Sequence, residues 1–162
     1  MKWNNLPLLH LYTLGEFMLF SYFFMSLINK PASIKTVLRY VLICGSLLIV
    51  LNSLSLQNIF GFNSYAKTCV QLSIITYAVL YFYNLVENHS FTSGESKGLR
   101  IINSAILIYY SGSLFIFMYG EFSLVNVDGY VVFWAFNAIL NFVFQLLILL
   151  GLWKAFYKKK VI

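Results

Sequence analysis

The sequence predicts an all-α integral membrane protein, folded as a five-helix antiparallel transmembrane bundle. Of its 162 residues, 60% are hydrophobic and only 10% are charged, and the mean hydropathy is +0.80. An average soluble domain carries roughly a quarter charged residues, so this chain has too few to solvate a globular surface. Five nearly uncharged windows also each reach the ~20 residues that a helix needs to cross a bilayer core. A soluble enzyme and a disulfide-stapled secreted protein are therefore excluded.

The short connections between these windows predict one transmembrane bundle over residues 1–162, without a second domain. The first helix is expected to end before Lys30 and Pro31, because charge and proline both stop a membrane helix. Residues 87–97 (ENHSFTSGESK) form the most polar segment and are expected to be a flexible loop. The predicted helices cover residues 8–29, 37–56, 66–86, 101–120 and 130–153.

The basic residues predict the orientation of the bundle. Nine of the eleven Lys and Arg residues fall on one side of the five predicted spans, and only Lys2 and Lys67 fall on the other. Cytoplasmic loops of membrane proteins carry such an excess, so the N terminus is expected outside and the C terminus in the cytoplasm. Because topology accounts for the positive charge, no nucleic-acid partner is expected.

Glu16 is the only carboxylate that lies deep within a predicted span. It falls about 4 Å from the centre of its helix, where a charged group costs at least ~2.5–3.5 kcal/mol, so it should face the bundle interior. Each of the other four helices places a polar side chain within about one turn of the same depth. These side chains are Asn52, Gln71, Ser113 and Asn137. The pattern predicts a polar pocket in the outer half of the membrane, although such amides also serve simply as packing contacts between helices.

The last predicted helix carries a polar stripe at three- and four-residue spacing. Trp134, Asn137, Asn141 and Gln145 share one helix face. Because an unpaired amide is costly in lipid, this stripe should be buried in the bundle or in an oligomer interface. With Tyr12, a neighbour of Glu16 on its helix, the candidate ligand-binding residues are Tyr12, Glu16, Asn52, Gln71, Ser113, Asn137, Asn141 and Gln145.

No enzymatic motif occurs in its required structural context, so no catalytic residue is assigned. The sequence lacks HExxH, CxxC and P-loop patterns, and its GxSxG match (GESKG, residues 94–98) lies in the polar segment and does not follow a predicted strand. His10 and His89 fall near opposite sides of the membrane, so no metal site is expected, and no particular cofactor is indicated. Cys44 and Cys69 lie at different depths and are expected to be unpaired, small core residues.

Three segments carry a resemblance to a known group of proteins. They are residues 101–117 (IINSAILIYYSGSLFIF), the stripe Trp134, Asn137 and Asn141, and the pattern LHxYxxxEF at residues 9–17. Together they resemble segments of small uncharacterised bacterial multi-pass membrane proteins, some of which occur beside two-component sensor kinases. The resemblance implies a sensing or accessory role in the bacterial plasma (inner) membrane. These 162 residues hold no phospho-acceptor or ATP-binding region, so signalling would pass to a partner.

Two other classes of function stay open at the level of sequence. A small transporter or channel subunit needs an aqueous path from the layer of Glu16 to the cytoplasm, and the inner half of the spans offers only Asn103 and Gln145 for it. A membrane-embedded enzyme needs a second catalytic group near Glu16. The expected partners are membrane lipids, together with a protein partner or further copies of the chain.

Single-cysteine labelling tests the orientation. In a background without the native cysteines, Lys2→Cys and Val125→Cys should react with an impermeant maleimide added outside the cell, while Ser93→Cys should react only after permeabilisation, because its loop lies with the basic residues. External labelling at position 93, or protection at position 125, would contradict the five-span arrangement.

Overall fold

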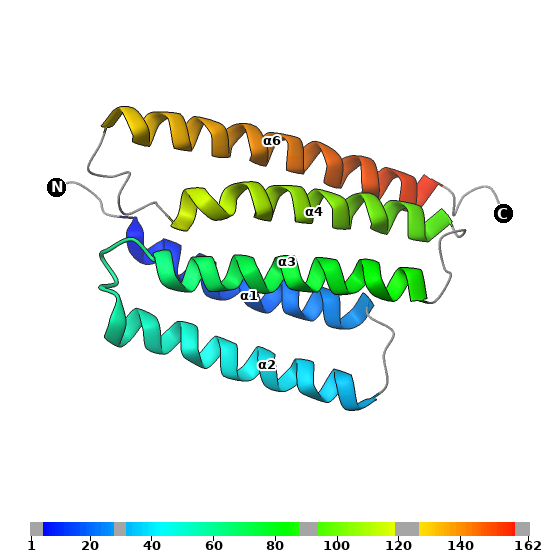
Figure 1. The fold of residues 1–162 in the computed structure, drawn as a ribbon, viewed down its shortest axis with the longest axis horizontal. Coiled ribbons are helices and arrows are strands. Elements are labelled where there is room, and N and C mark those ends of the chain that lie inside the picture. The colour runs from blue at the N-terminus through cyan, green and yellow to red at the C-terminus, as the bar shows by residue number, and fades with distance from the viewer. Residues whose placement is uncertain (1–4, 28–31, 88–93, 119–126, 158–162) are drawn as a thin grey trace.

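The computed structural model describes residues 5–27, 32–87, 94–118 and 127–157, and within these ranges all regular structure is helical. Figure 1 shows long helices lying side by side. The elements are α1 (Leu6–Leu27), α2 (Ala32–Leu51), the short η1 (Asn52–Leu56), α3 (Ser64–Glu87), α4 (Gly94–Met118) and α6 (Val127–Tyr157). The predicted all-helical class is confirmed.

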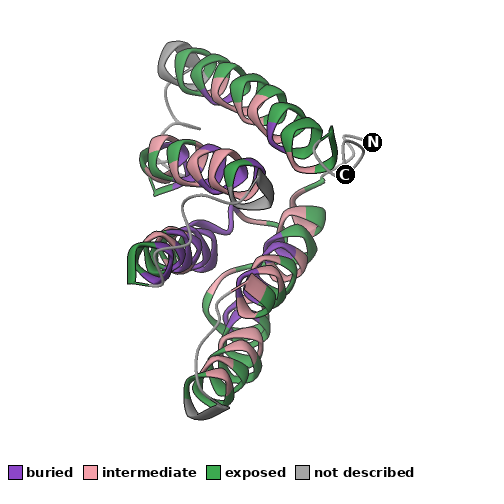
Figure 2. Ribbon diagram, turned by 90° about the vertical axis from the view of Figure 1, so that its right-hand side faces the viewer, coloured by how far each residue is buried: buried purple, intermediate pink, exposed green. Residues whose placement is uncertain are grey.

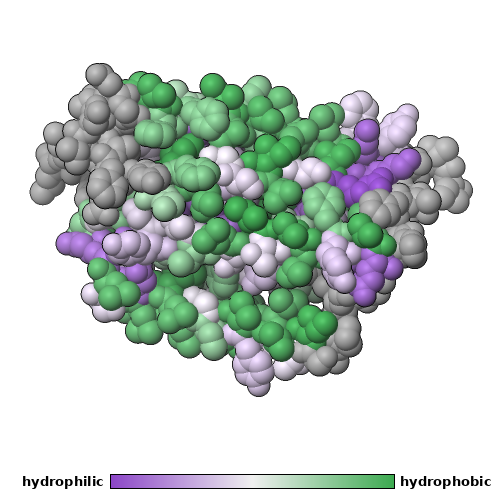
Figure 3. All heavy atoms as spheres, in the orientation of Figure 1, coloured by the Kyte–Doolittle hydropathy of each residue, from purple (hydrophilic) through white to green (hydrophobic). Residues whose placement is uncertain are grey.

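Five helices of the described ranges are long and apolar enough to cross a membrane. Figure 3 shows an apolar band across the middle of the molecule, with hydrophilic residues gathered towards its two ends. This distribution is expected when the middle of a protein faces acyl chains and the ends face water. The fold is therefore compatible with a multi-pass membrane protein. The five candidate spans are Leu6–Leu27, Ile34–Leu56, Ser64–Glu87, Lys97–Met118 and Val131–Tyr157.

The fourth helix begins earlier than the sequence predicts. α4 starts at Gly94, so the last residues of the expected polar loop, 94–97, are helical. Tertiary packing explains the extension, because Gly98 in this part of α4 lies directly against Gly151 of α6. A helix that is packed against a neighbour continues through residues of modest intrinsic helix propensity.

The helices are arranged roughly in a row rather than around one central axis. α6 forms one edge beside α4, α3 and α1 lie in the middle, and α2 forms the opposite edge (Figures 1 and 2). In α3 and in α4, 44% of the most apolar 18-residue stretch is buried, whereas the corresponding share is 6% in α2 and in α6. The core therefore lies between α1, α3 and α4. Aromatic contacts such as Phe24 with Tyr77 and Phe20 with Tyr110, at centroid distances of 5.9 and 5.3 Å, fill it.

The last turn of the second span is a π-helical turn. The backbone N–H of Gln57 donates to the carbonyl oxygen of Asn52 at 2.9 Å, five residues earlier. The Asn52 side chain donates to Gln57 Oε1 at 2.9 Å and to Asn63 Oδ1 at 3.2 Å. The wide turn thus ties the end of the second span to the residue that precedes α3.

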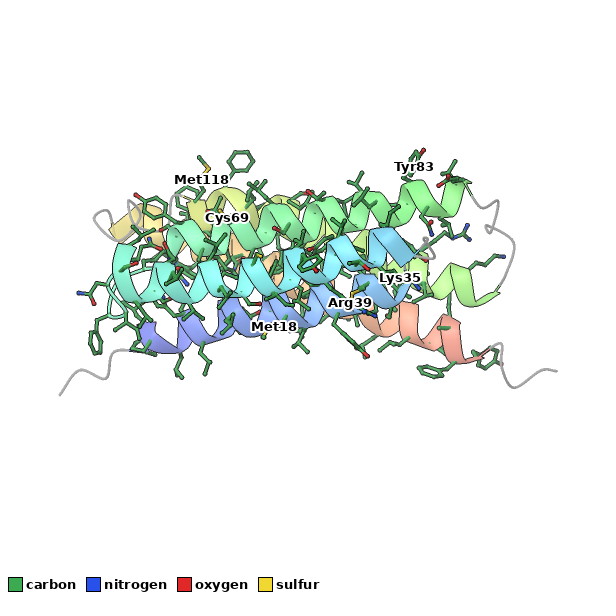
Figure 4. The ribbon with its side chains drawn as sticks, turned by 90° about the horizontal axis from the view of Figure 1, so that it is seen from below. Met18, Lys35, Arg39, Cys69, Tyr83 and Met118 are labelled. Carbon is green, nitrogen blue, oxygen red and sulfur yellow. The ribbon has the colours of Figure 1, made fainter. Side chains whose placement is uncertain are left out.

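The surface of the bundle includes both cysteines. Cys44 and Cys69 are free thiols, as predicted, but both are exposed and neither is a core residue. Cys44 is exposed because α2 lies at the edge of the row. Cys69 is exposed because it lies on a face of α3 that does not pack against the other core helices. Figure 4 places Cys69 towards the end of the molecule where Met118 lies, with Lys35 and Tyr83 towards the other end.

Close packing of α4 against α6 depends on glycine. A Cβ at Gly98 would lie 2.6 Å from the carbonyl oxygen of Gly151, a backbone atom that has little freedom to shift. A Cβ at Gly15 would meet nothing within 4 Å. Gly98→Ala should therefore lower the free energy of unfolding by about 1–3 kcal/mol, as overpacking does in other interiors.

The measurement is unfolding of detergent-solubilised protein, with Gly15→Ala as the matched control in another helix. The control should be neutral or slightly stabilising, because alanine favours helix more than glycine. Equal stability of the two variants would mean that α4 and α6 do not pack this closely.

Candidate functional site

Glu16 of α1 lies at the centre of a buried polar cluster. Glu16 is only 5% exposed, so the prediction that it faces the bundle interior is confirmed. One carboxylate oxygen, Oε2, lies 2.5 Å from Nζ of Lys67 on α3. The other, Oε1, accepts a hydrogen bond of 2.8 Å from the Tyr110 hydroxyl on α4. Both oxygens of one carboxylate thus join α1 to the two other core helices.

Lys67 is the member of this cluster that the sequence did not predict. It was counted among the charges on the outer side, but the residue is only 2% exposed. Its ammonium group also lies over two aromatic rings, 4.7 Å from the centroid of Tyr12 and 4.8 Å from that of Phe117. Cation–π attraction of this kind adds to the stabilisation from the carboxylate. Tyr12 therefore belongs to the cluster through its ring.

A signal for Lys67 was present in the sequence. Lys67 precedes Gln71 by four residues, and residues four apart share one helix face. Because Gln71 was already placed on an inward face, Lys67 had to lie on it too. A lysine side chain is long enough to carry its charge from near the end of a helix to a partner deeper inside.

Gln71 and Ser113 form a second contact between α3 and α4, one turn from Lys67. Both residues are fully buried, and Gln71 Nε2 donates to Ser113 Oγ at 2.9 Å. The Oε1 atom of Gln71 has no hydrogen-bond partner among the described residues. The predicted link between these two helices is present, but the hydrogen bonds of Glu16 go to Lys67 and Tyr110 rather than to this pair.

Asn52 belongs to a different group of hydrogen bonds, at the junction of η1 with α3. It bonds to Gln57 and Asn63, as described above. His10 of α1 joins the same region, because its ring nitrogens lie 2.8 Å from Ser53 Oγ and 3.4 Å from the Gly61 carbonyl oxygen. These contacts fix the connection before α3 in place.

The polar stripe of α6 is divided between the bundle and its surface. Asn137 is buried, and its Oδ1 atom has no partner among the described residues. Asn141 is half-buried and Gln145 is exposed, and Gln145 Nε2 donates to Asn141 Oδ1 at 3.1 Å. Hence the structure does not gather the eight predicted residues into one pocket. Tyr12, Glu16, Gln71 and Ser113 lie at or next to the ion pair, whereas Asn52 and the Asn141–Gln145 pair form separate hydrogen-bonded groups.

An apolar groove of about 450 Å³ runs along the side of the bundle, and two of its lining residues, Phe17 and Ala66, adjoin Glu16 and Lys67 in the chain. Phe17, which follows Glu16, forms part of its floor, and its ring lies so close to α2 that a Cβ at Gly45 would be 2.6 Å from Cζ. The side chains of Leu48 and Tyr65 on its rims are 65% and 66% exposed, so the groove opens sideways. Its lining residues are Phe17, Val41, Gly45, Leu48, Ile49, Asn52, Leu56, Tyr65, Ala66, Cys69, Val70 and Ser73.

Neither metal chemistry nor similarity assigns a function to these features. Within the described ranges, no three His, Cys, Asp or Glu side chains come together in a way that could hold a metal ion. Comparison of the chain with protein-family models, curated proteins and solved structures finds no match.

The ion pair predicts strong and non-additive effects of mutation. Glu16→Gln and Lys67→Met should each lower the free energy of unfolding by about 3–5 kcal/mol, because each leaves a buried charge without its counter-ion. The double variant Glu16→Gln/Lys67→Met should be more stable than the sum of the two losses predicts, since no unpaired charge remains.

Unfolding of the two single variants and the double variant in detergent measures these effects. Lys97→Met, which removes an exposed lysine, is the control for loss of positive charge. Additive effects of the two substitutions would contradict a direct interaction between Glu16 and Lys67.

Proposed function

We propose that the chain is a non-enzymatic, sensor-like or accessory subunit of the bacterial plasma membrane that holds a lipid chain in its lateral groove. The proposal includes the antiparallel arrangement of the five spans, with the N terminus outside and the C terminus in the cytoplasm. The groove is the observation that carries it. Two of its lining residues, Phe17 and Ala66, adjoin the ion-paired Glu16 and Lys67 in the chain.

The chemistry of the groove supports an acyl or isoprenoid chain as the ligand. Its lining is almost wholly apolar, and its polar groups come from few residues, among them Asn52 and Ser73. It lies between helices that are long enough to cross a membrane, so the surrounding medium is lipid. A long apolar chain with a polar group near Asn52 matches both properties, as apolar pockets with a few polar groups generally do.

The closed geometry of the ion pair favours this role over transport or catalysis. Both carboxylate oxygens of Glu16 are already engaged within the protein, and the Lys67 ammonium is covered by two aromatic rings. A transported cation or a substrate would first have to separate these charges inside an apolar interior, which is costly. The cluster is better suited to holding three helices together than to exchanging a ligand.

The groove also offers a route from ligand to partner. One wall is α2, which buries little of its surface and contacts α1 through Phe17 and Gly45. A ligand that fills the groove would bias the position of α2 against the fixed core. A protein partner at that edge of the bundle could respond to such a change, in keeping with an accessory role.

Groove-filling substitutions test the proposal. Ser73→Phe places a ring in the groove and should reduce the fraction of protein that carries a bound phospholipid in native mass spectrometry by at least about tenfold, because the chain and the ring compete for one volume. Thr76→Phe, on an exposed position of the same helix outside the groove lining, is the matched control and should leave lipid binding unchanged. Equal lipid retention in both variants would contradict the proposal.

A further inference from the structure

The exposed side of α6 carries a polar pair in the middle of an apolar surface. Gln145 is exposed and donates to Asn141. The candidate span runs from Val131 to Tyr157, which puts Gln145 about 1.5 Å along the axis from its midpoint. Large apolar side chains surround the pair, including Phe142 at 64% exposed and Leu149 at 63% exposed. An amide at this depth has no water to bond with, so a lipid-facing position is unfavourable for it.

The residues in line with Gln145 repeat in the heptad pattern of a coiled coil. Spacings of three and four residues alternate along one exposed line of the helix, and every member of the line is exposed in the single chain. The line comprises Val131, Ala135, Ala138, Phe142, Gln145, Leu149, Leu152 and Phe156. This repeat allows two helices to associate by knobs-into-holes packing, and one polar residue in the repeat can fix the register of the two helices. We call this line of residues the seam.

We propose that two copies of the chain associate through this seam, with the two α6 helices parallel and Gln145 facing Gln145 of the partner subunit. Copies of a membrane protein share one orientation, so a two-fold axis along the membrane normal brings the same depth of both helices together. An amide group is both donor and acceptor, which makes Gln145 complementary to itself. Asn141, one turn away, keeps its hydrogen bond to Gln145 and orients that amide.

Other surfaces of α6 do not offer this combination. The face towards α4 is already occupied, because Gly98, Gly112 and Gly151 form its close contacts. The remaining exposed positions of the span, such as Val143, Leu146 and Leu150, are apolar and suited to lipid. The proposal is independent of the ligand groove, because α6 contributes no residue to its lining. Figure 1 shows α2 and α6 at opposite edges of the row.

Disulfide cross-linking in native membranes tests the seam. In a Cys44→Ala/Cys69→Ala background, Leu149→Cys should give a covalent dimer on mild oxidation, whereas Leu150→Cys, its neighbour at the same depth on another face, should stay monomeric. Equal cross-linking at the two positions, or none at Leu149→Cys, would overturn the proposal. A cross-link from Leu149→Cys to a different protein would also overturn it and would assign the seam to that protein.

A second variant tests the amide itself. Gln145→Leu should raise the dimer dissociation constant in detergent about fivefold, a typical effect of losing one interhelical hydrogen bond in a membrane protein. Leu146→Ala, at the adjacent exposed position outside the seam, should leave the constant unchanged. An unchanged constant for Gln145→Leu would mean that the amide plays no part in association.

Discussion

One buried ion pair determines how the central helices of this protein can pack. Glu16 and Lys67 lie 51 residues apart in the chain, and Tyr110 lies 94 residues from Glu16, yet all three side chains meet. In an apolar interior neither charge can be left alone, so α1, α3 and α4 are held in a single relative arrangement. The remaining helices are added to this core, and they bury far less of their surface.

The same constraint acts on one side of the lateral groove. Phe17 follows Glu16 in the chain, so the ion pair fixes the backbone that carries the groove floor. On the other side, α2 meets α1 through apolar contacts such as that of Phe17 with Gly45, and the end of this span is held by the hydrogen bonds of Asn52 and Ser53. If the groove binds a lipid chain as proposed, that chain would contact Phe17 and α2 and would not reach the charged pair through the groove lining.

Sequence reasoning found what the membrane dictates and missed what depends on distant residues. The five spans followed from hydropathy because bilayer thickness sets their length, and the inward direction of Glu16 followed from the cost of desolvating a charge. The early start of α4 depends on Gly151, which no local pattern around Gly98 reveals. Lys67 was misread because its position in the chain suggests the outer surface, whereas the reach of its side chain decides where the charge lies.

The order of the helices across the bundle affects how two bound molecules would influence each other. α6 and α2 lie at opposite edges of the row, with α4, α3 and α1 between them (Figure 1), and the groove is lined by residues of α1, α3 and the α2 span. In a pair of chains joined through α6, the two grooves would therefore be at the far ends, open to the bilayer and sharing no surface. Lipid exchange at one groove would not sterically hinder the other, and any cooperativity between them would have to pass through both ion-paired cores.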